Sequence, residues 1–260
     1  MSSNIHATAI VSPKAEIGDN VTIGPYTIVE DDVVIGDDCR IASSVVLASG
    51  TRLDKKVSVF TGAVLGTVPQ DLKFKGEATT VEIGEGTTIR EYATINRGTD
   101  WRRRTTVGKS CLIMAYAHIA HDCDIRDNVI MVNSVNLAGH IVVEEFAIIG
   151  GVVPVLQFVK IGCHSMIGGG FRVPQDVPPY SLVAGYPLEV RGLNLVGLKR
   201  RGFKKEVIKA LQAAYKFMFY SKLNTTQAIE RIRSEVEMVP EVEHLIEFTK
   251  ETAHGMVKTN

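Results

Sequence analysis

The sequence has 260 residues, with 29 basic and 29 acidic side chains, 45% hydrophobic residues and 7% aromatic residues. This length and composition fit one large globular unit, or one such unit with a small appendage, and they exclude a disordered chain. The balanced charge argues against bulk attraction to nucleic acid or to an anionic membrane, so any basic patch must be local.

The cysteines and the N-terminus predict a soluble, cytoplasmic chain. The four cysteines have no paired spacing, which favours a reducing compartment over a disulfide framework. The first residues lack the basic and apolar regions of an export signal. The longest apolar stretch, residues 147–159, contains glycine and proline and is shorter than the roughly 20 residues that span a bilayer. We therefore expect no integral membrane segment.

A period of six residues organises the chain from Ile5 to Val173. Of the 29 positions that every sixth residue defines, 26 are Ile, Leu, Val or Met, and the exceptions are Asp71, Glu77 and Trp101. A strand alternates every two residues and a helix every 3.6, so neither explains a strict period of six. A β-solenoid with a turn after each hexad does explain it.

Three such hexads make one triangular coil of 18 residues, which predicts a parallel β-helix. Large aliphatic side chains fill the prism, and the small or β-branched fifth residue of each hexad fits its corners. The residue after the aliphatic one is often glycine, which we expect to permit backbone conformations that other residues resist.

Two segments interrupt the period, at residues 66–80 and 98–105, and the period resumes in the same phase after each of them. We therefore expect two loops extruded from an intact solenoid. Insertions of this kind commonly carry function, because the scaffold does not need them.

Helical spacing replaces the period of six beyond Pro179. One apolar face runs through residues 207–218, and Asn224 can cap a second helix that has Gln227 at its third position. Pro240 suits the first turn of a third helix. The tail is therefore predicted to be a small helical domain.

These patterns divide the chain into a β-helix domain, residues 1–190, and a C-terminal helical domain, residues 191–260. Residues 199–222 contain eight basic side chains and one acidic side chain, so the neutral total hides a positive patch. We expect the partner of this patch to be acidic or phosphorylated.

Stacked coils bring histidines together beside a turn. Residues 18 positions apart lie one above another, separated by about 4.8 Å, the spacing between strands. The predicted columns place Gly139 over His121, Gln157 over Gly139 and His140 over Asp122. His118 lies beside them, near the same turn.

This cluster suits acyl transfer by direct attack on a thioester. His121 would act as the general base for a hydroxyl, and the backbone N–H of Gly139 would stabilise the oxyanion on the acyl carbonyl. A thioester is already activated, so no Ser or Cys nucleophile is needed. We predict neither a metal nor another cofactor.

Six strings resemble the acyl-carrier-protein:UDP-N-acetylglucosamine O-acyltransferase family of hexapeptide-repeat enzymes. They are HIAHDC (118–123), LAGH (137–140), FAIIGG (146–151), QDLK (70–73), QDVPPY (175–180) and GLKRRGF (197–203). The resemblance implies a left-handed β-helix, an exception to the usual right-handed crossover, and a homotrimer with active sites between subunits. It also implies transfer of a 3-hydroxyacyl chain from acyl carrier protein to the 3-hydroxyl of UDP-N-acetylglucosamine, the first step of lipid A synthesis.

The resemblance assigns roles position by position. It implies that His121 is the general base, that Asp122 is its neighbour and that Gly139 donates to the oxyanion, with His118 and His140 lining the cleft. The implied substrate contacts are Gln70, Asp71 and Lys73 on the first loop, Gln157 on the nucleotide side, and Asn194, Arg200 and Arg201, with the arginines at the diphosphate and uridine end. Acyl carrier proteins are acidic, so Lys204 and Lys205 in the basic tail are assigned to binding the carrier protein.

Three features depart from the family pattern. Leu156 stands where a histidine usually precedes Gln157, Asn96 replaces another histidine, and Trp101–Arg104 on the second loop matches no family motif. Three alternatives to this reading stay open. The acceptor is a 3-amino sugar nucleotide, which would give N-acylation. Alternatively, the three histidines bind a metal, as in the hexapeptide-repeat carbonic anhydrases, or the solenoid is a non-catalytic scaffold.

Overall fold

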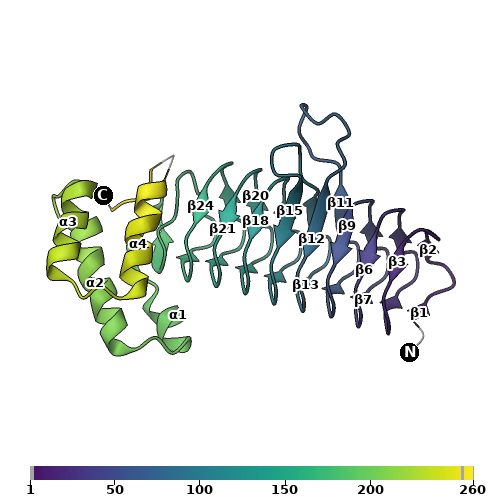
Figure 1. Cartoon of the computed structure of the whole chain (residues 1–260), viewed down its shortest axis with the longest axis horizontal. Helices are drawn as coiled ribbons and strands as arrows, with labels where there is room; N and C mark the ends of the chain where they lie inside the picture. Colours follow the sequence, from purple (N-terminus) through teal and green to yellow (C-terminus); the bar gives the residue numbers. More distant parts are fainter. Residues whose placement is uncertain (1–2, 253–254, 260) are drawn as a thin grey trace.

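The computed structural model describes residues 3–252 and 255–259, and it confirms a parallel β-helix followed by a helical tail. Figure 1 shows the short strands stacked along one axis, with the N-terminus at one end and the helices at the other. Each sheet pairs strands of successive coils, so that Ile5 lies beside Ile23 and Ile23 beside Ile41. The spacing of 18 residues along each column is therefore confirmed.

The strands form three sheets, which are the three faces of the prism. Sheet 1 consists of β1 (Asn4–Ile5), β4 (Thr22–Ile23), β7 (Arg40–Ile41), β10 (Ser58–Val59), β13 (Thr88–Ile89), β16 (Leu112–Ile113), β19 (Ile130–Met131), β22 (Ile148–Ile149), β25 (Met166–Ile167), β26 (Ser181–Ala184) and β27 (Glu189–Leu193). Sheet 2 consists of β2 (Ile10–Val11), β5 (Ile28–Val29), β8 (Val46–Leu47), β11 (Val64–Thr67), β14 (Thr94–Asn96), β17 (His118–Ile119), β20 (Asn136–Leu137) and β23 (Pro154–Val155). Sheet 3 consists of β3 (Glu16–Ile17), β6 (Val34–Ile35), β9 (Thr51–Leu53), β12 (Thr80–Ile83), β15 (Arg104–Val107), β18 (Asp124–Ile125), β21 (Val142–Val143) and β24 (Lys160–Ile161).

The second residue of each short strand points into the prism and forms the core. Ile23, Ile41 and Leu65 expose 2% of their surface or less. Burying a side chain of this size stabilises a fold by about 1.5–3 kcal/mol, and the strict period repeats this contribution in every coil. The four cysteines are free and buried, and Cys39, Cys111 and Cys123 belong to this core.

Glycine plays a different part from the one that the sequence suggests. The left-handed backbone conformation occurs three residues after the inward aliphatic residue, and non-glycine residues such as Asn20 and Asp38 adopt it there. Gly24 and Gly36, directly after the aliphatic residue, are glycines for another reason. A Cβ at either position would lie 2.8 Å from a backbone carbonyl carbon of the next coil. The expectation of an unusual conformation at these glycines is therefore wrong, and close packing between coils is the cause.

Both loops leave the prism at the corner where sheet 2 passes into sheet 3, which we call the 2–3 corner. The first loop comprises residues 68–79, between β11 and β12, and the second comprises residues 97–103, between β14 and β15. Both are shorter than the sequence indicates. Strand β11 includes residues 66–67, and β12 and β15 pair over four residues each, which draws residues 80 and 104–105 into strands. Figure 1 shows the loops rising from the middle of the solenoid.

The tail contains four helices, α1 (Leu195–Arg200), α2 (Lys205–Phe219), α3 (Thr225–Glu235) and α4 (Pro240–Glu251). The predicted cap is confirmed, because the Asn224 side chain accepts from the Gln227 N–H and Gln227 reciprocates. Pro240 is at the start of α4, as predicted. Helix α1 is an element that the sequence pattern did not predict. The predicted division at residue 190 falls within β27, which pairs with β26 in antiparallel fashion.

Polar contacts fasten the tail to the last coils. His244 of α4 bonds Glu144 of the solenoid at 2.8 Å, and the hydroxyl of Tyr215 in α2 donates to the Pro179 carbonyl. The Glu144 bond raises the pKa of His244. None of the described helices has the length and apolar character that crossing a bilayer requires.

Candidate active site

The 2–3 corner brings the predicted catalytic residues together. His121 and Asp122 lie between β17 and β18, and the next coil places Gly139 and His140 between β20 and β21. The N–H of His140 donates to the His121 carbonyl at 3.0 Å, which fixes the two coils in register. The predicted columns are therefore present.

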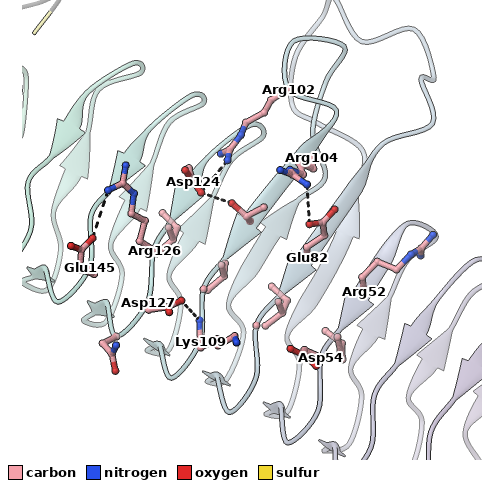
Figure 2. Close-up of a pocket in the computed structure, with 18 of the residues that line it drawn as sticks. Arg52, Asp54, Glu82, Arg102, Arg104, Lys109, Asp124, Arg126, Asp127 and Glu145 are labelled. Carbon is pink, nitrogen blue, oxygen red and sulfur yellow. Dashed lines mark hydrogen bonds and ion pairs between the residues drawn. The ribbon is translucent and has the colours of Figure 1, made fainter. Parts of the chain in front are cut away.

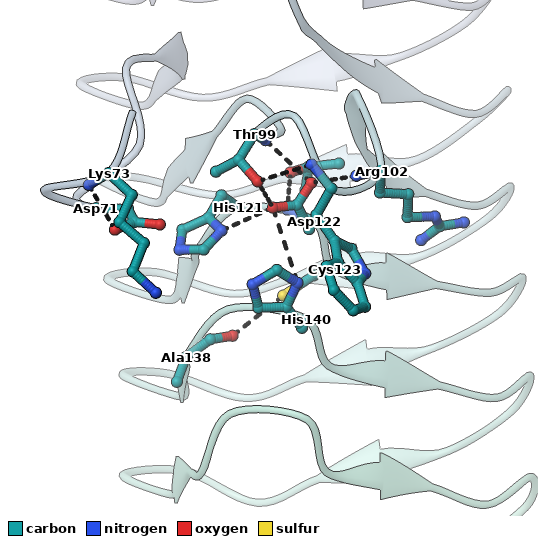
Figure 3. Close-up of polar contacts among 11 residues, drawn as sticks. Asp71, Lys73, Thr99, Arg102, His121, Asp122, Cys123, Ala138 and His140 are labelled. Carbon is teal, nitrogen blue, oxygen red and sulfur yellow. Dashed lines mark hydrogen bonds and ion pairs between the residues drawn. The ribbon is translucent and has the colours of Figure 1, made fainter. Parts of the chain in front are cut away.

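His121 and Asp122 form a hydrogen-bonded pair (Figure 3). Nδ1 of His121 lies 2.8 Å from Oδ2 of Asp122, and an ionised carboxylate only accepts, so Nδ1 carries the proton. The unprotonated Nε2 is then the nitrogen available to a substrate. The side chain of His121 is 12% exposed and that of Asp122 is fully buried, so the pair opens to solvent only through the imidazole.

The second loop surrounds the Asp122 carboxylate with donors. The backbone N–H and the hydroxyl of Thr99 donate to it at 3.0 and 2.6 Å, and the N–H of Arg102 donates at 3.2 Å. Burial acts to raise the pKa of Asp122, but these bonds and the His121 bond outweigh it and lower that pKa below its usual range. Asp122 is therefore a carboxylate at neutral pH.

Gly139 lies directly over the His121 ring. A Cβ at this position would be 2.6 Å from Cε1 of His121, so only glycine leaves room for the imidazole. Among the described residues, the backbone N–H of Gly139 donates to no acceptor. A free N–H beside a general base has the composition of an oxyanion hole.

His118 and His140 flank the pair. Nδ1 of His118 lies 2.7 Å from the Thr94 hydroxyl, and burial, followed by the effect of His121, lowers the pKa of His118. His140 meets the His121 ring edge-on, with ring centroids 5.0 Å apart. Burial also lowers the pKa of His140, although Asp122 opposes it. Both flanking imidazoles are therefore neutral near neutral pH.

The residues assigned to the first loop and to Gln157 lie around this corner. The negative charge of Asp71 influences the pKa of His140, so the first loop reaches the histidines. The N–H of Lys73 donates to Asp71 at 2.9 Å, and Figure 3 draws both beyond the His121 ring as seen from Asp122. Gln70 and Gln157 are exposed, and Gln157 follows Gly139 in the same column.

Asn194 and Arg201 lie at a different edge, the 3–1 corner, where sheet 3 passes into sheet 1. The guanidinium of Arg201 lies 4.8 Å from the ring centroid of Phe146, between β21 and β22. Its Nη1 is buried and has no hydrogen-bond partner among the described residues. The Asn194 side chain donates to the His164 carbonyl at 3.0 Å and accepts from Gly197 at the start of α1. Within one chain, these residues therefore lie at a different corner from His121.

The remaining residues of the basic tail are exposed on or near helices α1 and α2. Arg200 ends α1, and Lys204 and Lys205 lie at the start of α2. All three side chains are exposed, which leaves them accessible to a partner.

The outer face of sheet 3, between the two corners, forms a groove of about 900 Å³ (Figure 2). Three ion pairs join charged residues of this lining: Arg102 with Asp124 at 3.1 Å, Arg104 with Glu82 at 3.6 Å, and Arg126 with Glu145 at 3.6 Å. None of the His121 cluster lines it. We therefore locate the chemistry at the 2–3 corner rather than in this groove.

Three neighbours of the cluster escaped the sequence analysis. Thr99 holds Asp122, Phe158 stacks on His140 with centroids 4.5 Å apart, and Trp101 meets His140 edge-on at 5.5 Å. Thr99 and Trp101 belong to the unexplained second loop. The sequence did hold one signal for these residues: the second loop interrupts the period of six at the same corner that carries His121.

Three side chains at this corner have the spacing of metal ligands. Ligand atoms of His121, Asp122 and His140 lie within 4.8 Å of one another, whereas His118 is not part of this group. Among the described residues, the three-histidine set of the carbonic-anhydrase-like alternative is therefore not assembled. The existing bonds already satisfy the Asp122 carboxylate.

We predict that prolonged chelation leaves the activity of the enzyme unchanged. The base and its carboxylate partner are complete without a metal, so removing one has no effect on proton transfer. Initial rates before and after chelation, with elemental analysis of both samples, measure this. Stoichiometric zinc whose return restores activity to the stripped enzyme would contradict the prediction.

Two family models match the chain. The model described as UDP-N-acetylglucosamine O-acyltransferase, domain 2, matches residues 176–257, and the bacterial transferase hexapeptide model matches residues 4–49. The first covers the tail and the second the opening coils.

Similar proteins extend the match to nearly the whole chain. An acyl-[acyl-carrier-protein]–UDP-N-acetylglucosamine O-acyltransferase of Thermodesulfovibrio yellowstonii is 47% identical over 260 residues, covering 98% of this chain and all of the relative. One of Aliarcobacter butzleri is 53% identical, with 84% of each chain covered. The solved UDP-N-acetylglucosamine acyltransferase of Bacteroides fragilis is 40% identical, covers 97% of this chain and 99% of its own, and superposes with a TM-score of 0.96.

Proposed function

The chain belongs to the UDP-N-acetylglucosamine O-acyltransferase family, and we propose that it moves a 3-hydroxyacyl chain from acyl carrier protein to the 3-hydroxyl of UDP-N-acetylglucosamine. This reaction would be the first step of lipid A synthesis, carried out in the cytoplasm. The single observation that supports the chemistry best is His121, which the buried Asp122 holds beside the backbone N–H of Gly139, a group with no acceptor among the described residues.

The proposed reaction is a direct displacement at the thioester. Nε2 of His121 removes the proton from the acceptor hydroxyl as its oxygen bonds the acyl carbon, and the Gly139 N–H donates to the resulting oxyanion. The carbon–sulfur bond then breaks. The proton held by His121 passes to the leaving thiolate, which returns the imidazole to its starting state. Asp122 stabilises the imidazolium that exists between these two transfers.

The neutral state of His118 and His140 supports this assignment. Burial lowers the pKa of both imidazoles, so neither adds a positive charge beside His121. A protonated neighbour would oppose proton uptake by His121. Both can instead exchange hydrogen bonds with a neutral sugar or acyl group.

We further propose that each active site forms between two subunits of a homotrimer. The diphosphate end of the site would need Arg201, which lies at the 3–1 corner, whereas the base lies at the 2–3 corner. One subunit would supply the base and its neighbour the arginines. Nη1 of Arg201 is buried and has no partner in the described part of the chain, which suits an anionic ligand at that position.

The outer faces of the sheets favour this arrangement. Sheet 2 carries the exposed Ile10 and Ile28, and sheet 1 carries the partly exposed Ile130, Ile148 and Met166. Sheet 3 is mostly charged, as Figure 2 illustrates. Sheets 1 and 2 therefore have fewer charged groups to desolvate than sheet 3, which favours packing sheet 1 of one subunit on sheet 2 of the next. That packing would bring the 2–3 corner of one subunit against the 3–1 corner of its neighbour.

Product analysis tests the proposed function directly. A panel of 3-hydroxyacyl carrier proteins would be offered with UDP-N-acetylglucosamine and with its 3-amino analogue, and mass spectrometry would identify the products. We expect an O-acylated product from the hydroxyl sugar, and the panel also gives the preferred chain length. Product from the amino sugar alone would favour the N-acylation alternative.

We predict that the basic tail divides donor recognition from acceptor recognition. Reversing Lys204 and Lys205 to Glu should raise KM for the acidic carrier protein, with strong salt dependence, and barely change affinity for the sugar nucleotide. Replacing Arg200 or Arg201 with Ala should instead weaken sugar-nucleotide binding, because each lost charge-assisted bond contributes about 1.5–3 kcal/mol. Titrating both ligands against each variant measures the two effects.

The charge reversal has a matched control. Lys55→Glu with Lys56→Glu changes the net charge equally at exposed positions far along the solenoid, where ion pairs with Glu85 contribute little. Negative side chains at the N-terminus of α2 interact favourably with the helix dipole, so we expect the test variant to fold. Equal losses for donor and acceptor in every variant would show that the tail is not divided in this way.

A further inference from the structure

We propose that Thr99 is a positioning residue for the acyl transfer, because its hydroxyl and backbone N–H together hold Asp122 in the orientation that faces His121. The proposal rests on the function proposed above. It also assigns a function to the second loop, which interrupts the period of six beside the catalytic corner: the loop orients Asp122.

The two oxygens of Asp122 have separate sets of donors. Oδ2 accepts from the Thr99 hydroxyl at 2.6 Å and from Nδ1 of His121 at 2.8 Å. Oδ1 accepts from the N–H groups of Thr99 at 3.0 Å and Arg102 at 3.2 Å. Turning the carboxylate about its terminal bond would break both sets, so one oxygen remains aimed at the imidazole (Figure 3).

The direction of the Thr99 hydroxyl is itself fixed. The N–H of Trp101 donates to Oγ1 of Thr99 at 3.3 Å, so the hydroxyl hydrogen points to Asp122. The Asp122 N–H donates in turn to the hydroxyl of Thr105, 2.9 Å away, in β15 just after the loop. Asp122 is thus bonded both to the loop and to the strand that follows it.

An ordinary corner of this solenoid shows what the loop adds. Asp38 occupies the same position of its hexad, at a 3–1 corner, with the same φ of 60° as Asp122. Asp38 is exposed and its carboxylate bonds the Asn20 side chain, whereas Asp122 is buried beneath a loop. The loop therefore turns a solvated corner carboxylate into one with a fixed orientation. Of the three hydrogen bonds from the loop to Asp122, the one from the Thr99 hydroxyl is the shortest.

The first test replaces Thr99 with Val, which keeps its shape and its N–H but removes the hydroxyl. We expect kcat to fall by about 10- to 100-fold, the value of a bond to a charged group, while KM for both substrates changes by less than about twofold. Thr99→Ser should restore most of kcat. The matched control is Thr106→Val, which removes another 2.6 Å bond, to Asp124, away from the histidines; its kcat should stay within about twofold of wild type.

The second test asks whether Thr99 acts through Asp122. In an Asp122→Ala background, Thr99→Val should cause no further loss beyond about twofold, because its target is gone. A wild-type kcat for Thr99→Val alone, or a loss of full size in the Asp122→Ala background, would overturn the proposal.

A third measurement separates this proposal from the proposed function. The ¹⁵N chemical shifts of the His121 ring report which nitrogen carries the proton without any turnover. We expect a single Nδ1–H form in the wild type and in Thr106→Val, and a mixture of tautomers in Thr99→Val. Absence of acyl transfer by the wild type would refute the proposed function, whereas an unchanged tautomer in Thr99→Val would refute the positioning role.

Discussion

Replacing His121 with alanine is expected to lower kcat/KM for acyl transfer by about 10²- to 10⁴-fold, the usual contribution of a general base. Neither neighbouring imidazole has the hydrogen bond to a carboxylate that makes His121 a strong base. Nδ1 of His118 is engaged with the Thr94 hydroxyl, and Nδ1 of His140 lies 3.9 Å from Asp122, beyond hydrogen-bond distance. Initial rates with acyl carrier protein donor and UDP-N-acetylglucosamine measure the loss.

The His121 variant should remain folded and keep its oligomeric state. The residue lies at a corner outside the aliphatic core, so alanine removes little buried apolar area. Size-exclusion chromatography and thermal melting check this, and His6→Ala, at an exposed histidine of the first coil, is the matched control. Near-normal turnover in a folded His121→Ala protein would remove His121 from the mechanism.

Replacing Asp122 with asparagine is expected to reduce kcat by about 10³- to 10⁴-fold, comparable with loss of the orienting carboxylate in other base–carboxylate pairs. An amide has only one accepting atom, whereas the native carboxylate accepts on both oxygens. If the amide oxygen faces the backbone donors, its NH₂ group meets His121, and the imidazole must then accept at Nδ1. The proton moves to Nε2, and the base is disabled.

The control for this substitution is Asp38→Asn, at an exposed corner with the same φ of 60°. Asparagine tolerates this conformation well, so both variants should fold, and the control should retain wild-type rates. KM should change little in Asp122→Asn, because the fully buried carboxylate has no surface for substrate. A loss confined to KM would show that Asp122 contributes to binding rather than to the base.

Periodicity explains why so much of the site was predictable. Backbone hydrogen bonds between successive coils repeat every 18 residues, as in the pairing of His118 with Asn136. Two residues at that separation must stack whatever their side chains are. The positions of Gly139 over His121 and of His140 over Asp122 thus follow from counting, and so does the aliphatic core.

The same logic fails wherever the period is broken. Thr99 and Asp122 are 23 residues apart, a separation that the second loop determines and no column predicts. The glycines were also misread, because their cause is the approach of the next coil rather than their own conformation. Neither feature has a local signature, since each depends on atoms from another part of the chain.

The sequence by itself therefore determined the prism, its register, the helical tail and the histidine columns, because a strict repeat converts chain position into height along one axis. Tertiary structure alone decided how the second loop folds onto Asp122 and where the tail sets Arg201. The guanidinium lies against Phe146 at the 3–1 corner, away from the edge that holds His121. Non-repeating segments are positioned by side-chain contacts rather than by a regular backbone ladder, and those contacts exist only once the chain has folded.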